Sequence, residues 1–229
     1  MTGIAALLDV EGTTTPLDFV ASVLFPYAAA AIPDFLARHG GRPEVAEAST
    51  RIRADANGAE TDLPDPERVL TVVRRQMSAD AKAPGLKALQ GLVWAEGYRS
   101  GALRAPLFPD VPAALRRWAD AGRPARIYSS GSVLAQRLLF AHSDAGDMTP
   151  WIAGYHDTAM GPKREPASYA AIARDWGRPP ATIRFFTDQP AEAVAAQAAG
   201  MLTVLMRRPG NPPLPADPPC PVADGFDAF

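Results

Sequence analysis

The sequence predicts an α/β protein with a doubly wound parallel sheet and a helical part inserted near its N-terminus. Short apolar runs that end on polar residues recur along the chain. Helical patterns alternate with the later runs, and a long helical stretch separates the first run from the second. Strands that alternate with helices are typical of a parallel sheet that is covered by helices on both faces.

Four apolar runs are expected to form the buried strands of this sheet. They span residues 4–8, 125–128, 183–187 and 202–206. Each run is short and lacks the polar alternation of a half-exposed strand, which favours strands that are buried on both faces.

Helices are expected on either side of the later strands. The patterns place them at residues 109–121, 133–142, 167–176 and 191–199. The last two stop at Gly177 and Gly200. A glycine just past the last turn is a common helix end, so both boundaries are well defined.

Residues 17–107 are expected to be a helical insertion, because no connection within a compact sheet needs that many residues. Apolar residues recur at helical spacing in 66–78 and in 86–98. Residues 26–39 are expected to form a further helix that stops at Gly40.

The predicted domain organisation follows from this insertion. Residues 1–16 and 108–229 form the α/β core domain, and residues 17–107 form a helical cap inserted after the first strand. The proline-rich stretch 208–221 is expected to be an extended tail that packs on the core.

Composition and charge exclude several classes of protein. A net charge of −2 without a clustered basic stripe argues against nucleic acid as a partner. Cys220 is the only cysteine, so an intrachain disulfide and a cysteine-based zinc site are both excluded. The chain has no run of ~18 consecutive apolar residues and no signal-peptide pattern at its start. We therefore expect a cytoplasmic, monomeric protein with a small-molecule substrate and no membrane partner.

Polar side chains follow three of the predicted strands. They are Asp9 and Glu11, Ser129 and Ser130, and Asp188, and Lys163 precedes the third strand. The carboxyl ends of parallel strands form the ligand crevice of an open α/β sheet. Carboxylates gathered at this edge suit Mg²⁺, and with a hydroxyl group and a lysine they suit phosphoryl transfer.

Each of these residues has an expected chemical role. Asp9 can attack phosphorus and form an aspartyl-phosphate. Glu11 can protonate the leaving oxygen and then deprotonate the attacking water. Gly12 lets the backbone approach the phosphate closely. Ser129 or Ser130 can hydrogen-bond a phosphoryl oxygen and Lys163 can balance its charge, while one of the two serines is also expected to be the N-cap of the next helix.

The order of these motifs resembles the four motifs of the haloacid dehalogenase-like hydrolases. The matching residues are Asp9-x-Glu11-Gly12-Thr13, Ser129-Ser130-Gly131, Lys163 and Asp188. Glu11 departs from the aspartate that is usual in that superfamily. Together with "DVEGTTTPLDFV", "LFPYA", "LQGLVWAEGYRSG", "IYSSGSVLAQRLLF" and "RPGN" it resembles the acireductone synthase group, the bifunctional enolase-phosphatases of methionine salvage.

The resemblance implies a substrate, a metal and a site. The substrate is 2,3-diketo-5-methylthiopentyl-1-phosphate, which is enolised and then dephosphorylated to the acireductone 1,2-dihydroxy-3-keto-5-methylthiopentene. One Mg²⁺ is implied, held by the Asp9 side chain, the Glu11 main-chain carbonyl and Asp188, with Ser129, Ser130 and Lys163 on the substrate. Pro162 and the pair Gln189-Pro190 depart from the residues that this group usually has at these positions.

Two other functions fit the same residues. One is a phosphomonoesterase of the same fold that acts on another small phosphate ester. The other is a phosphate-accepting signalling module, which also places an aspartate, a hydroxyl group and a lysine at strand ends. Such modules are about half this length and have no helical cap, so the sequence favours the enzyme.

Overall fold

The computed structural model describes residues 3–229, which fold into two compact units. The first unit runs to Val20 and continues with Arg104–Phe229, and the second is Ala21–Leu103. The predicted boundaries, 16/17 and 107/108, lie a few residues from these positions.

The segment that re-enters the first unit explains where the division falls. The amide of Ala105 donates to the carbonyl of His142 at 3.1 Å. Thr15 Oγ1 donates to the carbonyl of Pro106 at 2.6 Å, and the amide of Leu107 donates to Asp144 Oδ1 at 3.2 Å. These bonds fix the segment to the first unit before the predicted boundary is reached.

A six-stranded parallel sheet forms the centre of the first unit, which confirms the predicted fold class. The strands are β1 (Ala5–Leu8), β2 (Ala125–Tyr128), β3 (Ile152–His156), β4 (Ile183–Thr187), β5 (Leu202–Met206) and β6 (Val222–Ala223). Their order is β3-β2-β1-β4-β5-β6, and every neighbouring pair is parallel. The chain winds outward from β1 in both directions, so the topological switch point lies between β1 and β4.

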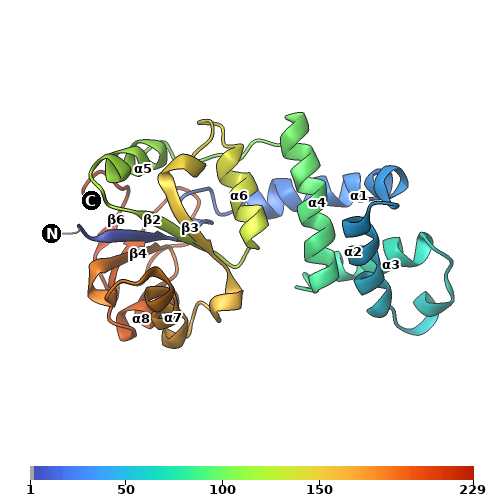
Figure 1. Ribbon diagram of the computed structural model, residues 1–229. Coiled ribbons are helices and arrows are strands. Elements are labelled where there is room, and N and C mark those ends of the chain that lie inside the picture. Colours follow the sequence, from blue (N-terminus) through green and yellow to red (C-terminus); the bar gives the residue numbers. More distant parts are fainter. Residues whose placement is uncertain (1–2) are drawn as a thin grey trace. The chain divides into compact units, whose positions relative to one another are not determined.

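Helices cover the sheet on both sides. They are α5 (Val111–Asp120), α6 (Val133–Ala141), α7 (Pro166–Trp176) and α8 (Pro190–Ala198). Figure 1 shows α5 on one side of the sheet and α7 and α8 on the other. All four helices lie where the sequence pattern predicts them, while β3 and β6 were not predicted.

Aromatic side chains fill both faces of the sheet. On one face Tyr169 packs edge-on against Tyr128 and contacts Phe185, with ring centroids 5.6 and 5.1 Å apart. On the other face Trp118 stacks on Phe186 at 5.9 Å. Burial of such large rings supplies much of the apolar area that stabilises a domain of this size.

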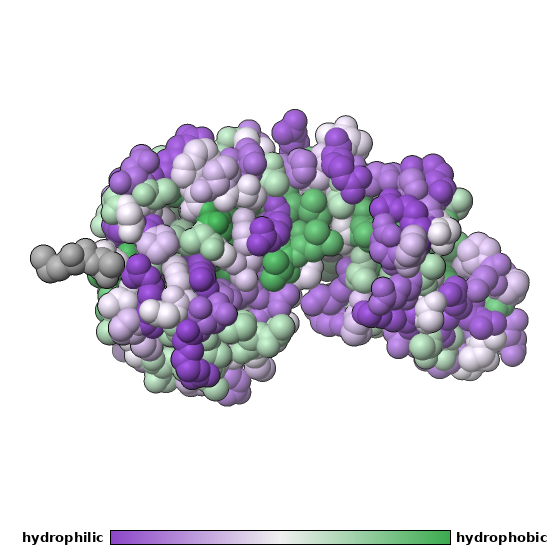
Figure 2. Space-filling view, viewed as in Figure 1, coloured by the Kyte–Doolittle hydropathy of each residue, from purple (hydrophilic) through white to green (hydrophobic). Residues whose placement is uncertain are grey.

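The second unit consists of helices. They are the π-helical turn Val20–Leu24, which begins at the unit boundary, α1 (Phe25–His39), α2 (Pro43–Ala54), the 3₁₀ turn Gly58–Asp62, α3 (Glu67–Ser78) and α4 (Pro84–Ser100). The predicted inward face of α3 is buried through Val69, Val72 and Val73. Figure 2 shows mostly hydrophilic residues on the visible surface of α2 and α3, as expected when the apolar faces point inward.

One helix in the described residues is long and apolar enough to cross a membrane by length and composition. It spans Val20–His39, and 28% of its apolar 18-residue stretch is buried. Core helices of globular proteins pass the same test. Here Ala28, Ile32 and Phe35 are buried, and Pro33 lies within the helix without ending it.

Candidate active site

The site lies at the carboxyl ends of β1 and β4, the two strands at the switch point. Asp9 follows β1 directly, and its amide donates to the carbonyl of Phe186 on β4 at 3.0 Å. Asp188 follows β4 in the same way. Only 5% of Asp9 and 6% of Asp188 is exposed, so the sheet brings two of the predicted carboxylates together in a buried place.

Three groups that can donate a hydrogen bond surround the carboxylate of Asp9. Its Oδ1 accepts from the amide of Val10 at 2.7 Å and lies 2.6 Å from Lys163 Nζ. Its Oδ2 accepts from Thr187 Oγ1 at 3.1 Å. Hydrogen bonds to ionised groups are the strong ones, so the carboxylate is fixed in one orientation at the strand end.

Lys163 reaches this carboxylate from a loop whose carbonyl groups accept hydrogen bonds from side-chain hydroxyl groups. Tyr128 Oη donates to the carbonyl of Gly161 at 2.8 Å, Ser168 Oγ to that of Pro162 at 2.7 Å, and Tyr169 Oη to that of Lys163 at 2.7 Å. Three consecutive carbonyls are thus held by side chains of the sheet and of α7. Pro162 therefore contributes to the loop through its carbonyl.

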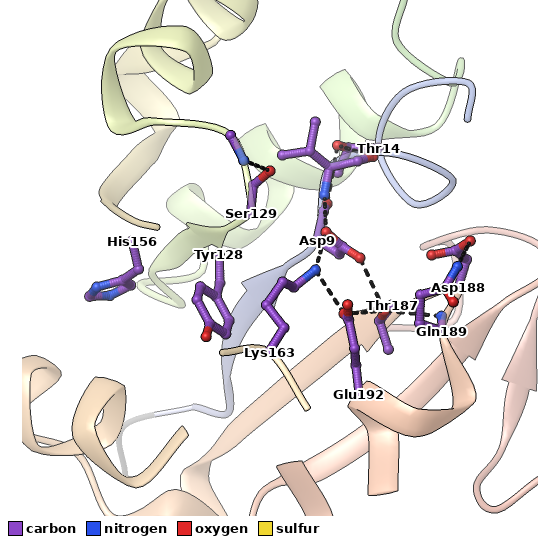
Figure 3. Close-up of polar contacts among 12 residues, drawn as sticks. Asp9, Thr14, Tyr128, Ser129, His156, Lys163, Thr187, Asp188, Gln189 and Glu192 are labelled. Carbon is purple, nitrogen blue, oxygen red and sulfur yellow. Dashed lines mark hydrogen bonds and ion pairs between the residues drawn. The ribbon is translucent and has the colours of Figure 1, made fainter. Parts of the chain in front are cut away.

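Glu192 in the first turn of α8 is a third buried carboxylate of the site, which the sequence analysis missed. Its Oε2 lies 2.7 Å from Lys163 Nζ and accepts from Thr187 Oγ1 at 3.0 Å. Figure 3 shows Lys163 pointing between Asp9 and Glu192, with Thr187 on the opposite side of the two carboxylates. The Thr187 hydroxyl has a single proton, so it can serve only one of the two carboxylates at a time.

The surroundings shift the pKa values of these groups. Burial, together with the charge of the Asp9 carboxylate, raises the pKa of Glu192 to about 7, although Lys163 offsets part of the effect. Burial alone would lower the pKa of Lys163, but the Asp9 and Glu192 carboxylates outweigh it and leave that pKa above its ordinary value. Lys163 therefore stays charged at neutral pH.

Asp188 carries excess negative charge into the site. Burial, together with the charge of the nearby Asp9 carboxylate, raises the pKa of Asp188 to about 6. Gln189 donates from Nε2 to Asp188 Oδ2 at 2.8 Å. This side chain therefore places a carboxamide donor directly on the carboxylate.

Gly12 forms the turn that follows Asp9 and Glu11. Its φ of +69° lies in the left-handed region that favours glycine. A Cβ at this position would come within 2.6 Å of Asp188 Oδ2 and 3.0 Å of Asn211 Oδ1. The turn therefore needs glycine both for its backbone angle and for the space above its Cα.

The two predicted serines differ in their placement. Ser129 is buried, and its Oγ accepts from the amide of Gly131 at 3.1 Å. Ser130 is exposed. The prediction that one of them caps the next helix is wrong, because the N-cap of α6 is Ser132, whose Oγ accepts from the amide of Ala135 at 3.3 Å.

Glu11 is the remaining candidate residue, and the buried His156 lies near the cluster without being part of it. Glu11 stands in the turn two residues after Asp9, and its side chain is half-buried. His156 is buried, but Figure 3 shows it beyond Tyr128, away from Asp9. Among residues 3–229, no three side chains of His, Cys, Asp or Glu are grouped so that they could hold a metal ion. A metal ion here would therefore need main-chain oxygen ligands as well. The ligands that the sequence resemblance implies include one, the main-chain carbonyl of Glu11.

Comparison with known proteins places the fold and site in a class. A family model described as haloacid dehalogenase-like hydrolase matches residues 5–200. The UTR4 protein of Saccharomyces cerevisiae has a similar crystal structure, with a TM-score of 0.85 and 33% identity over 99% of this chain and all of that one. The fold and site therefore define a hydrolase of the haloacid dehalogenase-like class.

Curated relatives narrow the class. Enolase-phosphatase E1 of Pseudomonas aeruginosa strain UCBPP-PA14 is 48% identical over 92% of both chains. Enolase-phosphatase E1 of Synechococcus elongatus is 49% identical over 90% of this chain and 89% of its own. The chain belongs to the enolase-phosphatase E1 family, which confirms the resemblance seen in its motifs.

Proposed function

We propose that this chain is a bifunctional enolase-phosphatase that converts 2,3-diketo-5-methylthiopentyl-1-phosphate to 1,2-dihydroxy-3-keto-5-methylthiopentene and phosphate. Family membership supports the reaction class. The observation that carries the proposal is the buried contact of 2.6 Å between Lys163 Nζ and Asp9 Oδ1 at the carboxyl end of β1. A fixed carboxylate with a cation beside it can accept a phosphoryl group while the charge of that group is balanced.

In the first half of phosphate removal, Asp9 is the proposed nucleophile. A carboxylate oxygen of Asp9 forms a bond to phosphorus, and the bond between phosphorus and the substrate oxygen breaks. Glu11 gives its proton to that leaving oxygen. The products of this half are the dephosphorylated enol and an aspartyl-phosphate at Asp9.

In the second half, water attacks the same phosphorus. Glu11, now ionised, accepts the proton of the water, and the bond between Asp9 and phosphorus breaks. Free phosphate leaves and both carboxyl groups return to their starting states. Glu11 thus acts first as the acid and then as the base.

Lys163 and the serines are proposed to bind the phosphoryl group. The ammonium of Lys163 already stands 2.6 Å from the attacking carboxylate, so it is in place to contact the oxygens of a phosphoryl group there. Ser129 and Ser130 are proposed donors at the end of β2. Glu192 keeps Lys163 at the site when Asp9 becomes esterified, because it holds the same ammonium at 2.7 Å.

The residues present fit one Mg²⁺. Asp9 and Asp188 are buried carboxylates on adjacent strands, and the raised pKa of Asp188 reflects burial together with the charge of Asp9. Such hard oxygen ligands suit Mg²⁺, and hydrolases of this class generally depend on it. We propose that Asp9, the Glu11 carbonyl and Asp188 would hold it. When bound, Mg²⁺ would offset negative charge on the transferring group.

The enolisation step needs a base next to the carbonyl group. Glu11 is the proposed base, because glutamate has a longer side chain than the usual aspartate and can reach a carbon as well as an oxygen. We expect Glu11→Gln to abolish enolisation, measured as enediol absorbance under anaerobic conditions. Formation of the phosphorylated enol at the parental rate would show that another group is the base.

The finer biological setting is also proposed. Residues 21–103 correspond to the proposed cap domain, on which the choice between this substrate and another phosphate ester would depend. We propose a cytoplasmic location in methionine salvage and a monomeric enzyme. A single buried cysteine is compatible with a reducing compartment.

The test of the function is a paired assay. Purified protein, Mg²⁺ and the diketo-methylthiopentyl phosphate are mixed without oxygen, and enediol absorbance and free phosphate are followed together. EDTA and Asp9→Asn serve as controls. Both signals should rise and both should need the metal. Hydrolysis of other phosphate esters with no turnover of this one would keep the fold and reject the substrate.

A further inference from the structure

The "RPGN" segment after β5 brings a carboxamide to the turn that carries Gly12. Asn211 Nδ2 donates to the carbonyl of Gly12 at 2.8 Å and lies 3.5 Å from the carbonyl of Met206 at the end of β5. These two carbonyls fix which end of the carboxamide is the nitrogen. The other end, Oδ1, is therefore an acceptor only.

Arg208 holds this segment in place. Its Nε donates to the carbonyl of Thr13 at 3.0 Å, and its two terminal nitrogens contact both oxygens of Asp110 at 2.8 and 3.0 Å. The guanidinium also lies between the rings of Phe108 and Phe226, 4.6 and 4.9 Å from their centroids. Two side chains three residues apart thus hold the consecutive carbonyls of Gly12 and Thr13, and Asn211 has little freedom to move.

The oxygen of Asn211 is a buried acceptor without a donor. Oδ1 is inaccessible to solvent and has no hydrogen-bond partner among the described residues. It borders the space above Gly12 Cα, and Asp188 Oδ2 borders the same space. A buried carbonyl-type oxygen that lacks a donor costs about 1–3 kcal/mol, so its position beside Asp188 calls for a donor that the folded chain itself does not supply.

We propose that Asn211 is a further positioning residue of the cation site, and that its Oδ1 accepts a hydrogen bond from a water molecule bound to Mg²⁺. The inference rests on the proposed function, because it needs the cation beside Asp188. Mg²⁺ usually keeps several of its waters in proteins, and the hydrogens of those waters need acceptors. Asn211 offers a neutral oxygen there, at a position that its own Nδ2 and Arg208 have fixed. Because Oδ1 is inaccessible in the fold without the cation, the proposal requires the neighbouring Asp188 side chain to shift when the cation and its waters bind.

The test is Mg²⁺ binding, measured by titration calorimetry on the full chain without substrate. Asn211→Ala should weaken binding about 10- to 100-fold, the usual effect of removing an outer-shell partner. Asn211→Asp keeps an oxygen at this place and should bind Mg²⁺ at least as tightly as the parent. Gln197→Ala is the matched control, because Gln197 also donates its carboxamide to a carbonyl of the C-terminal segment, that of Pro219, but away from the site. It should leave binding unchanged.

Each other outcome has a definite meaning. If Asn211→Ala binds Mg²⁺ with the parental affinity, the inference is overturned. It is also overturned if Asn211→Ala and Asn211→Asp weaken Mg²⁺ binding equally, because the whole effect would then come from the lost contact between Asn211 Nδ2 and the Gly12 carbonyl. Thermal unfolding in EDTA checks that each variant is folded, and Asn211→Ser replaces Asn211→Ala if the latter is not. If the parent chain binds no Mg²⁺, both the proposed metal site and this inference are wrong. If the parent binds Mg²⁺ and Asn211→Ala binds it equally well, only this inference is wrong.

Discussion

The charged side chains of the site include more carboxylates than cations. Asp9, Asp188 and Glu192 are buried carboxylates, and Lys163 is the cation that contacts two of them. Buried charges without enough partners are costly, and proteins retain them mainly where chemistry needs them. Burial first, and the charge of Asp9 second, raise the pKa of Asp188 to about 6 and that of Glu192 to about 7.

Asp9→Asn tests the nucleophile. Asparagine keeps the shape of the side chain but cannot form a stable acyl phosphate by attack on phosphorus, so phosphate release should fall roughly 10⁴-fold or more, as for other residues that act as one catalytic unit. Enolisation should be partly retained, because it does not use this carboxylate as a nucleophile. The measurement is phosphate release. Mass spectrometry of the variant protein is the control, because it shows whether the asparagine has deamidated back to aspartate. Full phosphatase activity in an intact variant would end the covalent mechanism.

Glu192→Gln tests how Lys163 is shared. Without the Glu192 charge the ammonium is drawn to Asp9 alone, which hinders attack by that carboxylate. Hydrogen bonds to charged groups contribute ~1.5–3 kcal/mol, so kcat should fall about 10- to 100-fold while KM changes less. Glu192→Asp should recover part of the rate. Asp224→Asn, which breaks the exposed pair with Arg207, is the control and should be neutral. An unchanged kcat in Glu192→Gln would contradict this role, and so would a fall in kcat for Glu192→Asp as large as that for Glu192→Gln.

At the scale of elements, the turn after β1 depends on contacts from distant segments, and Gly12→Ala tests it. A left-handed backbone costs a non-glycine residue roughly 1–2 kcal/mol, and the new methyl group would also press on Asp188 at 2.6 Å. We expect a larger loss of stability than this and a loss of Mg²⁺-dependent activity. Gly122→Ala is the matched control: its φ is +65° and no atom lies within 4 Å of an added Cβ. It should show the backbone cost alone, measured by urea unfolding, with activity unchanged. Equal costs in both variants would mean that the space above Gly12 is unimportant.

The elements with strong patterns were predictable, and the weak ones were not. The strands β1, β2, β4 and β5 are apolar runs, and each is buried in the sheet. The edge strand β3 (Ile152–His156) has an exposed residue and a glycine, which hide its pattern. The strand β6 has two residues only and is defined by pairing with β5. Helix α2 had a readable signal in Val45, Ala48 and Ile52, which was overlooked.

The same limits apply to the site. Asp9 and Asp188 were predicted because each directly follows a predicted strand. Lys163 was predicted because the order of the motifs resembles that of a known family, and the fold brings the three side chains together. Glu192 was missed because an acidic residue in the first turn of a helix is common for reasons of helix stability alone. Ser132 and Asn211 depend on how loops return to the sheet, and no local pattern predicts that.

At the scale of the whole molecule, the site is assembled from segments that are far apart in the sequence. Residues 9, 163, 192 and 211 reach it from four different loops or helix ends. Formation of the site therefore requires the folded core, and the buried charges of the site reduce the stability of that core. Ligands that bind only the folded state restore stability in proportion to the logarithm of their concentration.

Stability should therefore depend on pH and on Mg²⁺ through these carboxylates. The pKa of Asp188 is 3.8 in an ordinary setting and about 6 in the folded chain, so between these values the folded state binds more protons than the unfolded state. Its stabilising contribution is complete below about pH 4 and is lost as the pH rises through 6. Glu192 acts in the same direction up to about pH 7. Glu192 is present in both proteins, so the Tm of the parent relative to Asp188→Asn in EDTA should fall between about pH 4 and pH 6 through Asp188.

The comparison with Asp188→Asn cancels the exposed ion pairs, which act with the opposite sign. Arg75, for example, lowers the pKa of Glu60 through a side-chain hydrogen bond, and this contribution is the same in both proteins. Mg²⁺ should raise the Tm of the parent above about pH 6, where Asp188 is ionised, and should have little effect on Asp188→Asn. A parental Tm that rises relative to the variant between pH 5 and pH 7 in EDTA would show that Asp188 is stabilised, not strained, by its surroundings. In that case the charge excess at the end of β4 could no longer be the reason for a cation there.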